Sequence, residues 1–222
     1  MDLASAFPPF GLRVTSGDLE LRLPDDAELV RLAEVAAAGI HPPERSPFVV
    51  PWNVGEPDEV RRGFLQFHWA SRGKVSPEAW VFELGVFRDG TPVGVQGVGA
   101  KAFAATRSAG TGSWLGLAHH GQGIGKRMRL MALHLLFEGF GAEDATTEAF
   151  DDNPESNGVT RSLGYAPNGV ALLDRQGTRA TENRYRMTRE MWSVRPDLHR
   201  PDVTLSGVPP VRTMLGLDEQ PA

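Results

Sequence analysis

Three glycines spaced two residues apart, Gly121, Gly123 and Gly125, stand between an expected strand and an expected helix. Glycine lets a backbone approach a ligand closely, and the first N–H groups of a helix have no partner within it. The first turn of that helix carries the basic residues Lys126, Arg127 and Arg129, which oppose the helix dipole unless an anion lies between them. A plain glycine-rich turn would have the same composition, but together these features favour a phosphate-bearing ligand.

Neither of the two common phosphate-binding loops fits this segment. A Walker loop has Ser or Thr after its lysine, whereas Arg127 follows Lys126 here. A dinucleotide-binding turn needs a small residue where Lys126 stands. Because Glu143 and Asp144 do fall where such a turn has its acidic residue, a nicotinamide-dependent oxidoreductase remains a weak alternative.

Asn153 and Ser156 stand three residues apart and therefore share one face at the expected start of a helix. An amide there could bind polar groups of a ligand, and a hydroxyl could donate a proton. The same pair is a common helix cap, so the residues alone leave both interpretations open. The histidines do not have the spacing of zinc ligands, and we expect no metal site.

The composition excludes several classes of protein. The chain has 222 residues, a formal charge of −5 and no cysteine. An acidic balance argues against a protein that wraps nucleic acid, and the lack of cysteine excludes disulfides and thiolate metal sites. No apolar run is long enough to span a membrane, and the N-terminus is not a basic lead-in to a signal peptide. We therefore expect a cytoplasmic protein with neither nucleic-acid nor membrane partners.

The elements that must position these residues follow from the apolar pattern. Strands are expected at about 19–23, 80–87, 92–98, 111–117, 145–150, 170–173 and 184–191, and helices at about 25–39, 57–69 and 126–137, with a short helix ending at Leu163. Several antiparallel strands precede one strand–glycine loop–helix–strand unit, which predicts an α+β fold. We expect a loose leader at 1–17, one domain at 18–192 and a proline-containing tail at 193–222.

The segment His120–Gly125 resembles the Q/R-x-x-G-x-G/A motif of the GCN5-related N-acyltransferases, with histidine in its first position. Trp114-Leu115-Gly116, Asn153-x-x-Ser156 and Leu163-Gly164-Tyr165 are similar to the branch that includes the ribosomal-protein N-terminal acetyltransferases. The segments at 41–48, 51–52, 93–96 and 112–117 further resemble an actinobacterial, succinyl-CoA-dependent member of that branch. The resemblance covers roughly residues 18–192.

This resemblance implies a central, mostly antiparallel twisted sheet of six to seven strands with helices on both faces. It implies direct attack of an amine on the thioester of acetyl-CoA or succinyl-CoA, held in a splayed gap between strands without an acyl-enzyme, and the lack of cysteine agrees with this. Ser156 would be the catalytic residue that protonates the departing thiolate, and Asn153 would assist this step through its contacts with the cofactor. The residues expected to bind coenzyme A are Trp114, Leu115, Leu117, Gln122, Gly123, Ile124, Gly125, Lys126 and Asn153.

The general base is the least defined part of the expected site. Ribosomal-protein acetyltransferases of this branch have a carboxylate where Arg175 stands, so the neighbouring Asp174 is our catalytic candidate. The other candidates are Glu148, Asp152, Glu83, His41 and water. We expect His41, Trp52, Gln96 and Arg175 to bind substrate.

A guanidinium at Arg175 could form a two-pronged bond to a succinyl carboxylate, or it could be a solvated charge on an edge strand. The acceptor would be a small-molecule amine or a protein or peptide amine. By resemblance alone, the protein would be a homodimer or a higher homo-oligomer. A non-catalytic acyl-CoA-binding module or partner protein is the alternative.

Overall fold

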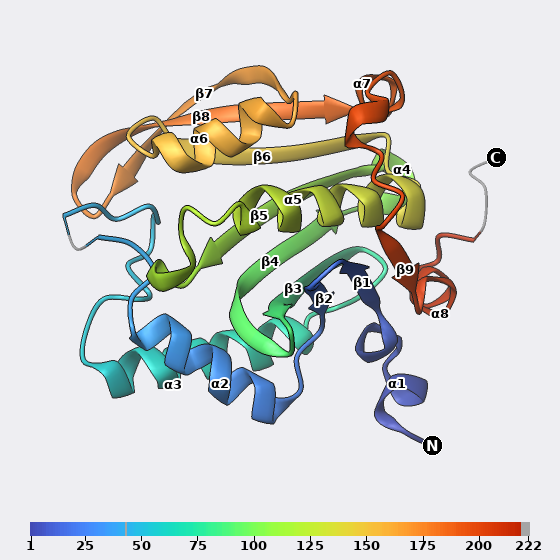
Figure 1. Cartoon of the computed structure of the whole chain (residues 1–222), viewed down its shortest axis with the longest axis horizontal. Helices are drawn as coiled ribbons and strands as arrows, with labels where there is room; N and C mark the ends of the chain where they lie inside the picture. The colour runs from blue at the N-terminus through green and yellow to red at the C-terminus, as the bar shows by residue number, and fades with distance from the viewer. Residues whose placement is uncertain (43, 219–222) are drawn as a thin grey trace.

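The computed structural model describes residues 1–42 and 44–218, which form one mixed β-sheet with helices on both faces (Figure 1). The strands lie in the order β7-β8-β6-β5-β4-β3-β2-β1-β9. Within the described chain β5 and β6 are the parallel pair, and the other neighbours are antiparallel. The α+β class and the mostly antiparallel sheet are therefore confirmed.

The strands and helices have the following bounds. The strands are β1 (Arg13–Ser16), β2 (Leu19–Arg22), β3 (Ala79–Arg88), β4 (Thr91–Lys101), β5 (Ser108–Leu115), β6 (Asp144–Phe150), β7 (Ala166–Arg175), β8 (Thr178–Thr188) and β9 (Thr204–Ser206). The helices are α1 (Leu3–Ala6), α2 (Asp26–Ala37), α3 (Pro57–Arg72), α4 (Phe103–Thr106), α5 (Ile124–His134), α6 (Pro154–Ser162), α7 (Arg189–Ser193) and α8 (Val208–Met214).

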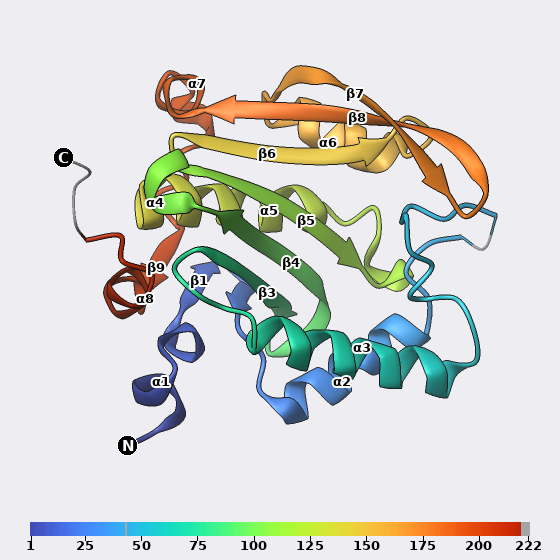
Figure 2. The same ribbon diagram turned by 180° about the vertical axis from the view of Figure 1, so that it is seen from behind.

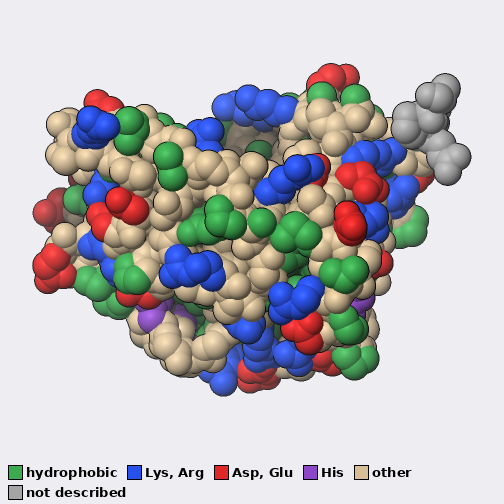
Figure 3. Space-filling view, turned by 90° about the horizontal axis from the view of Figure 1, so that it is seen from above, with side chains coloured by type: hydrophobic (Ala, Val, Ile, Leu, Met, Phe, Trp, Pro, Cys, Tyr) green, Lys and Arg blue, Asp and Glu red, His purple; other side chains and the backbone are tan. Residues whose placement is uncertain are grey.

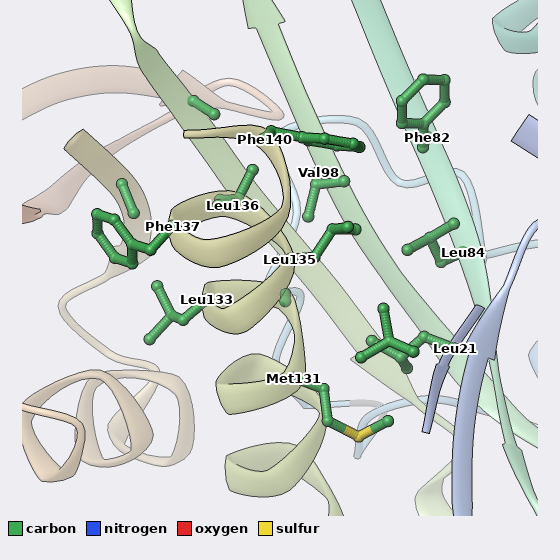
Figure 4. Close-up of a cluster of buried hydrophobic side chains, with 14 of the residues drawn as sticks. Leu21, Phe82, Leu84, Val98, Met131, Leu133, Leu135, Leu136, Phe137 and Phe140 are labelled. Carbon is green, nitrogen blue, oxygen red and sulfur yellow. The ribbon is translucent and has the colours of Figure 1, made fainter. Parts of the chain in front are cut away.

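Helix α5 lies against one face of the sheet and carries the larger core. The helix continues beyond His134 as one wider turn over Leu135–Phe140. Leu135 and Phe140 point toward Leu84 and Val98 of the sheet (Figure 4). This apolar packing fixes the position of α5 relative to β5. The loop that precedes α5 is therefore held in place as well.

Helices α2 and α3 cover the opposite face, on the side seen in Figure 2. A reciprocal capping box joins Asp25 and Glu28 at the start of α2, as the sequence of an N-terminal helix end predicts. The apolar stripe of α2 packs with Phe64 of α3 against Phe87 and Val95 of the sheet. This second core is smaller, and it leaves room for a cavity between α3 and the sheet.

The sheet has nine strands rather than the expected six to seven, because both terminal segments add to its edge. Part of the expected leader is β1, which buries Val14 and Ser16. Part of the expected tail is β9, where Leu205 pairs with Val14. A strand of three residues is too short to show an alternating pattern, so its pairing with β1 was not evident from the sequence.

The surface carries charges of both signs, interspersed over the side seen from above in Figure 3. None of the described helices combines the length and the apolar character that crossing a bilayer requires. Neither sign dominates this side of the molecule, which agrees with the small formal charge of −5 for the whole chain.

The buried His68 of α3 makes the free energy of unfolding dependent on pH. Its side chain is 3% exposed, its ring lies 4.2 Å from that of Phe64, and burial lowers its pKa to about 3. The unfolded chain takes up a proton near pH 6.5 that the folded chain excludes, so stability falls as the pH falls. We expect this residue to lower the free energy of unfolding by about 2 kcal/mol between pH 7.5 and pH 5.

Urea unfolding at both pH values, with native protein and His68→Phe, tests this expectation. The variant should lose about 2 kcal/mol less than the native chain over this pH interval. Equal losses in the two proteins would contradict it.

Candidate active site

Strands β5 and β6 form a fork. They pair in parallel from Ser108 and Asp144 to Thr111 and Thr147, and beyond these residues they no longer pair with each other. β5 remains paired with β4 on its outer side, and β6 with β8. The backbone groups on the facing edges beyond the vertex are therefore available to a ligand.

Side chains on the α5 face hold the vertex of this fork. The Thr111 hydroxyl donates to the Thr146 carbonyl at 3.3 Å, and the Thr147 hydroxyl donates to the Thr111 carbonyl at 3.1 Å. Arg129 of α5 is 4% exposed and donates to the Thr147 hydroxyl at 2.8 Å and to the Ser113 hydroxyl at 3.1 Å. One buried guanidinium thus spans the two strands just where they separate.

The glycine loop follows β5 and ends at the first turn of α5. Gly121 and Gly123 have φ angles of 71° and 76°, in the left-handed region that favours glycine. A Cβ atom at either position would meet nothing within 4 Å, so packing against the described protein does not require glycine there. The loop is an open cradle at the N-terminus of a helix, which suits a phosphate group.

The side chains of His120 and Gln122 form hydrogen bonds within this loop. The His120 ring lies 3.1 Å from the Leu115 carbonyl, and the Gln122 amide donates to the Ala118 carbonyl at 2.9 Å. Arg127 binds Asp18, whereas Lys126 is exposed beside the loop. Lys126 is therefore the basic side chain of this turn best placed to meet a bound anion.

A cavity of about 620 Å³ lies between α3 and the sheet and reaches the fork. Its wall is aromatic, because the rings of Trp52 and Trp114 lie 5.8 Å apart and both lie about 6 Å from Phe64. Ser113 and Thr111 line it at the fork. The lining residues are Phe48, Val50, Trp52, Gly63, Phe64, Phe67, His68, Val81, Glu83, Val95, Gly97, Val98, Gly99, Gly110, Thr111, Gly112, Ser113, Trp114 and Glu148.

Two carboxylates lie at opposite ends of one row across the cavity floor. Glu83 of β3 pairs with Gly97 of β4, which pairs with Gly112 of β5. Since Thr111 pairs with Thr147, Glu148 of β6 continues the row beyond the fork vertex. Burial raises the pKa of Glu83 to about 7, and burial together with Glu182 raises the pKa of Glu148. Glu83 could therefore exchange a proton near neutral pH.

Asn153 and Ser156 lie at the start of α6, where Asn153 caps the helix. The Asn153 side chain accepts a hydrogen bond from the Ser156 amide at 3.1 Å. The Ser156 side chain is half-buried, and among the described residues its hydroxyl has no hydrogen-bond partner. The cap therefore leaves that hydroxyl free to serve a ligand.

The other expected substrate residues lie outside the cavity lining. Gln96 is fully buried on the α5 face and donates to the carbonyls of Gly97 and Gly112. His41 accepts a hydrogen bond from the Asn53 amide at 2.7 Å, within the loop that carries Trp52. Only Trp52 of the four expected substrate residues lines the cavity.

Asp174 and Arg175 lie at the end of the β7–β8 hairpin. Asp174 accepts a hydrogen bond from the Gly177 amide at 2.7 Å. Arg175 binds both carboxylate oxygens of Asp152, at 3.0 and 2.7 Å, and donates to the Ser46 carbonyl at 3.3 Å. The turn and the ion pair occupy both side chains, and neither lines the cavity.

Sequence reasoning named Arg129 only as a basic residue of the first helical turn and missed its place at the fork. It also missed His68, and it did not single out Glu83 from the other candidate bases. One signal was present, because glycines alternate along β4 at Gly97 and Gly99 and along β5 at Gly110 and Gly112. Alternating glycines place several bare positions on one face of a strand. The described residues contain no cluster of acidic or histidine side chains that could hold a metal ion.

Asn157, also missed, fastens α6 to the sheet. Its side chain accepts from the Tyr185 hydroxyl at 2.6 Å and donates to the carbonyls of Phe150 and Asn153 at 2.7 Å. Asn157→Leu leaves these buried groups unpaired, so we expect a loss of about 2–4 kcal/mol in the free energy of unfolding. Asn153→Ala removes only a cap and should cost about 1 kcal/mol, which chemical denaturation can compare. Equal losses would contradict this ranking.

Comparison with known proteins agrees with this geometry. The family model described as an acetyltransferase (GNAT) domain matches residues 18–166. Among solved structures, RimJ of Mycobacterium smegmatis in complex with CoA-disulfide has 21% identity and a TM-score of 0.68, covering 81% of this chain and 86% of that chain.

Two further structures have the same fold. RimL, a ribosomal L7/L12 alpha-N-protein acetyltransferase in complex with coenzyme A, has 20% identity and a TM-score of 0.62, covering 79% of this chain and 97% of its own. The ribosomal-protein-S5-alanine acetyltransferase of Vibrio fischeri has 16% identity and a TM-score of 0.59, covering 81% and 98%. Since the family model matches more than half of the sequence, the chain belongs to the GNAT acetyltransferase family and is an acyltransferase.

Proposed function

We propose that the protein transfers an acyl group from acetyl-CoA or succinyl-CoA to a primary amine by direct attack. The observation that carries the proposal is the fork between β5 and β6, which joins the glycine loop to the cavity. A thioester held at the fork would have its anionic end at the loop and its acyl end at the cavity. The acceptor amine would approach through the cavity.

The loop and the free edge of β5 divide the binding of coenzyme A between them. The amides of residues 122–126 would hold the pyrophosphate at the start of α5, with Lys126 beside it. The pantetheine amides would pair with the free edge of β5 around Trp114 and Leu115, as an added strand pairs with a sheet edge. The backbone groups of Leu117 are already bonded to Gly39 and His120, so Leu117 would contribute its exposed side chain instead. Ser156, whose hydroxyl is free at the start of α6, would protonate the departing thiolate.

Glu83 is our proposed proton acceptor. The amine nitrogen attacks the thioester carbonyl carbon, so that a C–N bond forms and the C–S bond breaks. The amine proton passes to Glu83, directly or through water, and the thiolate takes a proton from Ser156. Water then carries the proton from Glu83 to the Ser156 oxygen, which restores both groups. Glu83 suits this role because it lines the cavity and its pKa lies near 7, whereas Asp174 lies in a turn outside the lining.

The donor acyl group could carry a carboxylate. Arg175 is already paired with Asp152, so a second cation is needed beside the cavity. Arg129 donates to the Ser113 hydroxyl on the α5 face of the sheet, so its guanidinium lies at the fork vertex and is not among the residues that line the cavity on the α3 face. Its described partners there are hydroxyls rather than carboxylates. A succinyl carboxylate would pair with this cation only if it reached the fork vertex, because an unpaired buried charge is costly.

The first prediction concerns the loop. Gly123→Ala puts a methyl group into the open cradle, and we expect at least a tenfold loss of affinity for acetyl-CoA and succinyl-CoA. Gly169→Ala is the matched control, because Gly169 also has a positive φ and open surroundings but lies on β7. Calorimetric titration of both variants measures the effect. Equal acyl-CoA affinities in the two variants would overturn the assignment of the loop.

The second prediction concerns the proton acceptor. Because the carboxylate form of Glu83 is the active one, kcat/KM should rise as the pH rises through about 7. Glu83→Gln should lower kcat by roughly 10²–10⁴-fold and remove this limb of the pH profile. If Asp174 were the proton acceptor instead, Asp174→Asn would remove the rise of kcat/KM with pH and Glu83→Gln would keep it. Rates measured from pH 5.5 to 9 for both variants decide between them.

A further inference from the structure

The floor of the cavity lacks side chains at positions where the protein has room for them. A Cβ atom at Gly112 would meet nothing within 4 Å, and one at Gly110 would lie 3.6 Å from the Thr146 hydroxyl, an ordinary contact. By contrast, a Cβ atom at Gly94 would lie 2.3 Å from the Trp114 carbonyl, so packing requires that glycine. Glycine inside a strand weakens it by about 0.5–1 kcal/mol. The bare floor at Gly110 and Gly112 therefore indicates a ligand that lies flat against the strands.

The wall above this floor is built from aromatic rings. Trp52 contacts Phe48, Phe64 and Trp114 at ring distances of 5.4 to 6.2 Å. Phe67 lines the rim and is 56% exposed. Rings on one side and a bare strand surface on the other form a slot for a flat apolar group.

The charged groups of the cavity are all of one sign. Glu83 and Glu148 line it, and within the described chain no lysine or arginine side chain is among the lining residues. Aromatic faces also attract cations. An acceptor that enters this cavity is best matched if it combines a positive charge with an apolar body.

Resting on the function proposed above, we infer that the acceptor is a primary amine joined by a short aliphatic link to an aromatic or similarly flat apolar group. Its ammonium group would lie between the carboxylates of the floor row, and its apolar group between Gly112 and the aromatic wall. A small arylalkylamine and a peptide with an aromatic first residue share this chemistry. The experiment includes both sources.

The substrate test compares amines of matched length. With saturating acetyl-CoA, kcat/KM should be at least 100-fold higher for 2-phenylethylamine or a Phe-Ala-Ala peptide than for ethanolamine or a Ser-Ala-Ala peptide. A preference for the phenylalanine peptide over 2-phenylethylamine would identify a peptide N-terminus as the acceptor. The reverse preference would identify a small-molecule amine. Equal turnover of the apolar and polar amines would overturn the inference and leave the acyltransferase function standing.

Two variants locate the acceptor in this slot. Gly112→Val fills the floor and should raise KM for 2-phenylethylamine at least tenfold, with KM for acetyl-CoA and the thermal midpoint little changed. Phe67→Ala should lower the preference for 2-phenylethylamine over ethanolamine. Trp69→Ala is its matched control, because Trp69 is another exposed aromatic residue of α3 that lies outside the cavity lining. An unchanged preference in both Gly112→Val and Phe67→Ala would overturn the inference.

A direct binding measurement separates this inference from the proposed function. Calorimetric titration of 2-phenylethylamine into the protein with bound coenzyme A needs no turnover. If the amine binds to native protein and not to Gly112→Val, the slot is confirmed even where no acyl transfer occurs, and only the proposed reaction fails. If the amine neither binds nor reacts, the inference is wrong.

Discussion

The structure depends on the vertex of the fork between β5 and β6. Two parallel strands would ordinarily continue their ladder, but here the hydroxyls of Thr111 and Thr147 and the guanidinium of Arg129 end it. Beyond this point each strand keeps only its outer partner. A buried guanidinium that has hydroxyl partners is costly to desolvate, so packing alone does not account for it. The glycine loop, the cavity and the free edge of β5 all lie around this vertex, and each needs the strands to be apart.

The two faces of the sheet have different roles. On the α5 face, apolar packing is continuous and holds the loop at a fixed distance from β5. On the α3 face, the core is smaller and glycines replace side chains near the fork. The glycines are not equivalent, because a Cβ atom at Gly99 would lie 2.8 Å from the Val81 side chain, whereas Gly112 leaves space that no described atom fills. Only the second kind points to a ligand.

Features set by neighbouring residues could be predicted from the sequence. The cap at Asp25 and the glycine loop each depend on a few consecutive residues, and the structure has both. The pairing of β1 with β9 could not be predicted, because it joins short segments almost 200 residues apart in sequence and depends on the edge of the sheet. The row of residues that contains Glu83 could not be predicted for a related reason. Its members come from four strands, and only the pairing register places them side by side.

Arg175 links two segments that lie far apart in the sequence. Its contacts join the β7–β8 hairpin to Asp152 and to the Ser46 carbonyl, in the loop that also carries Phe48 and Trp52. That loop supplies part of the aromatic wall, so the ion pair holds the wall over the cavity without lining it. Because the pair is partly exposed, its own contribution to stability is small. Its importance is therefore geometric: the position of the wall relative to the fork depends on a hairpin whose residues do not enter the site.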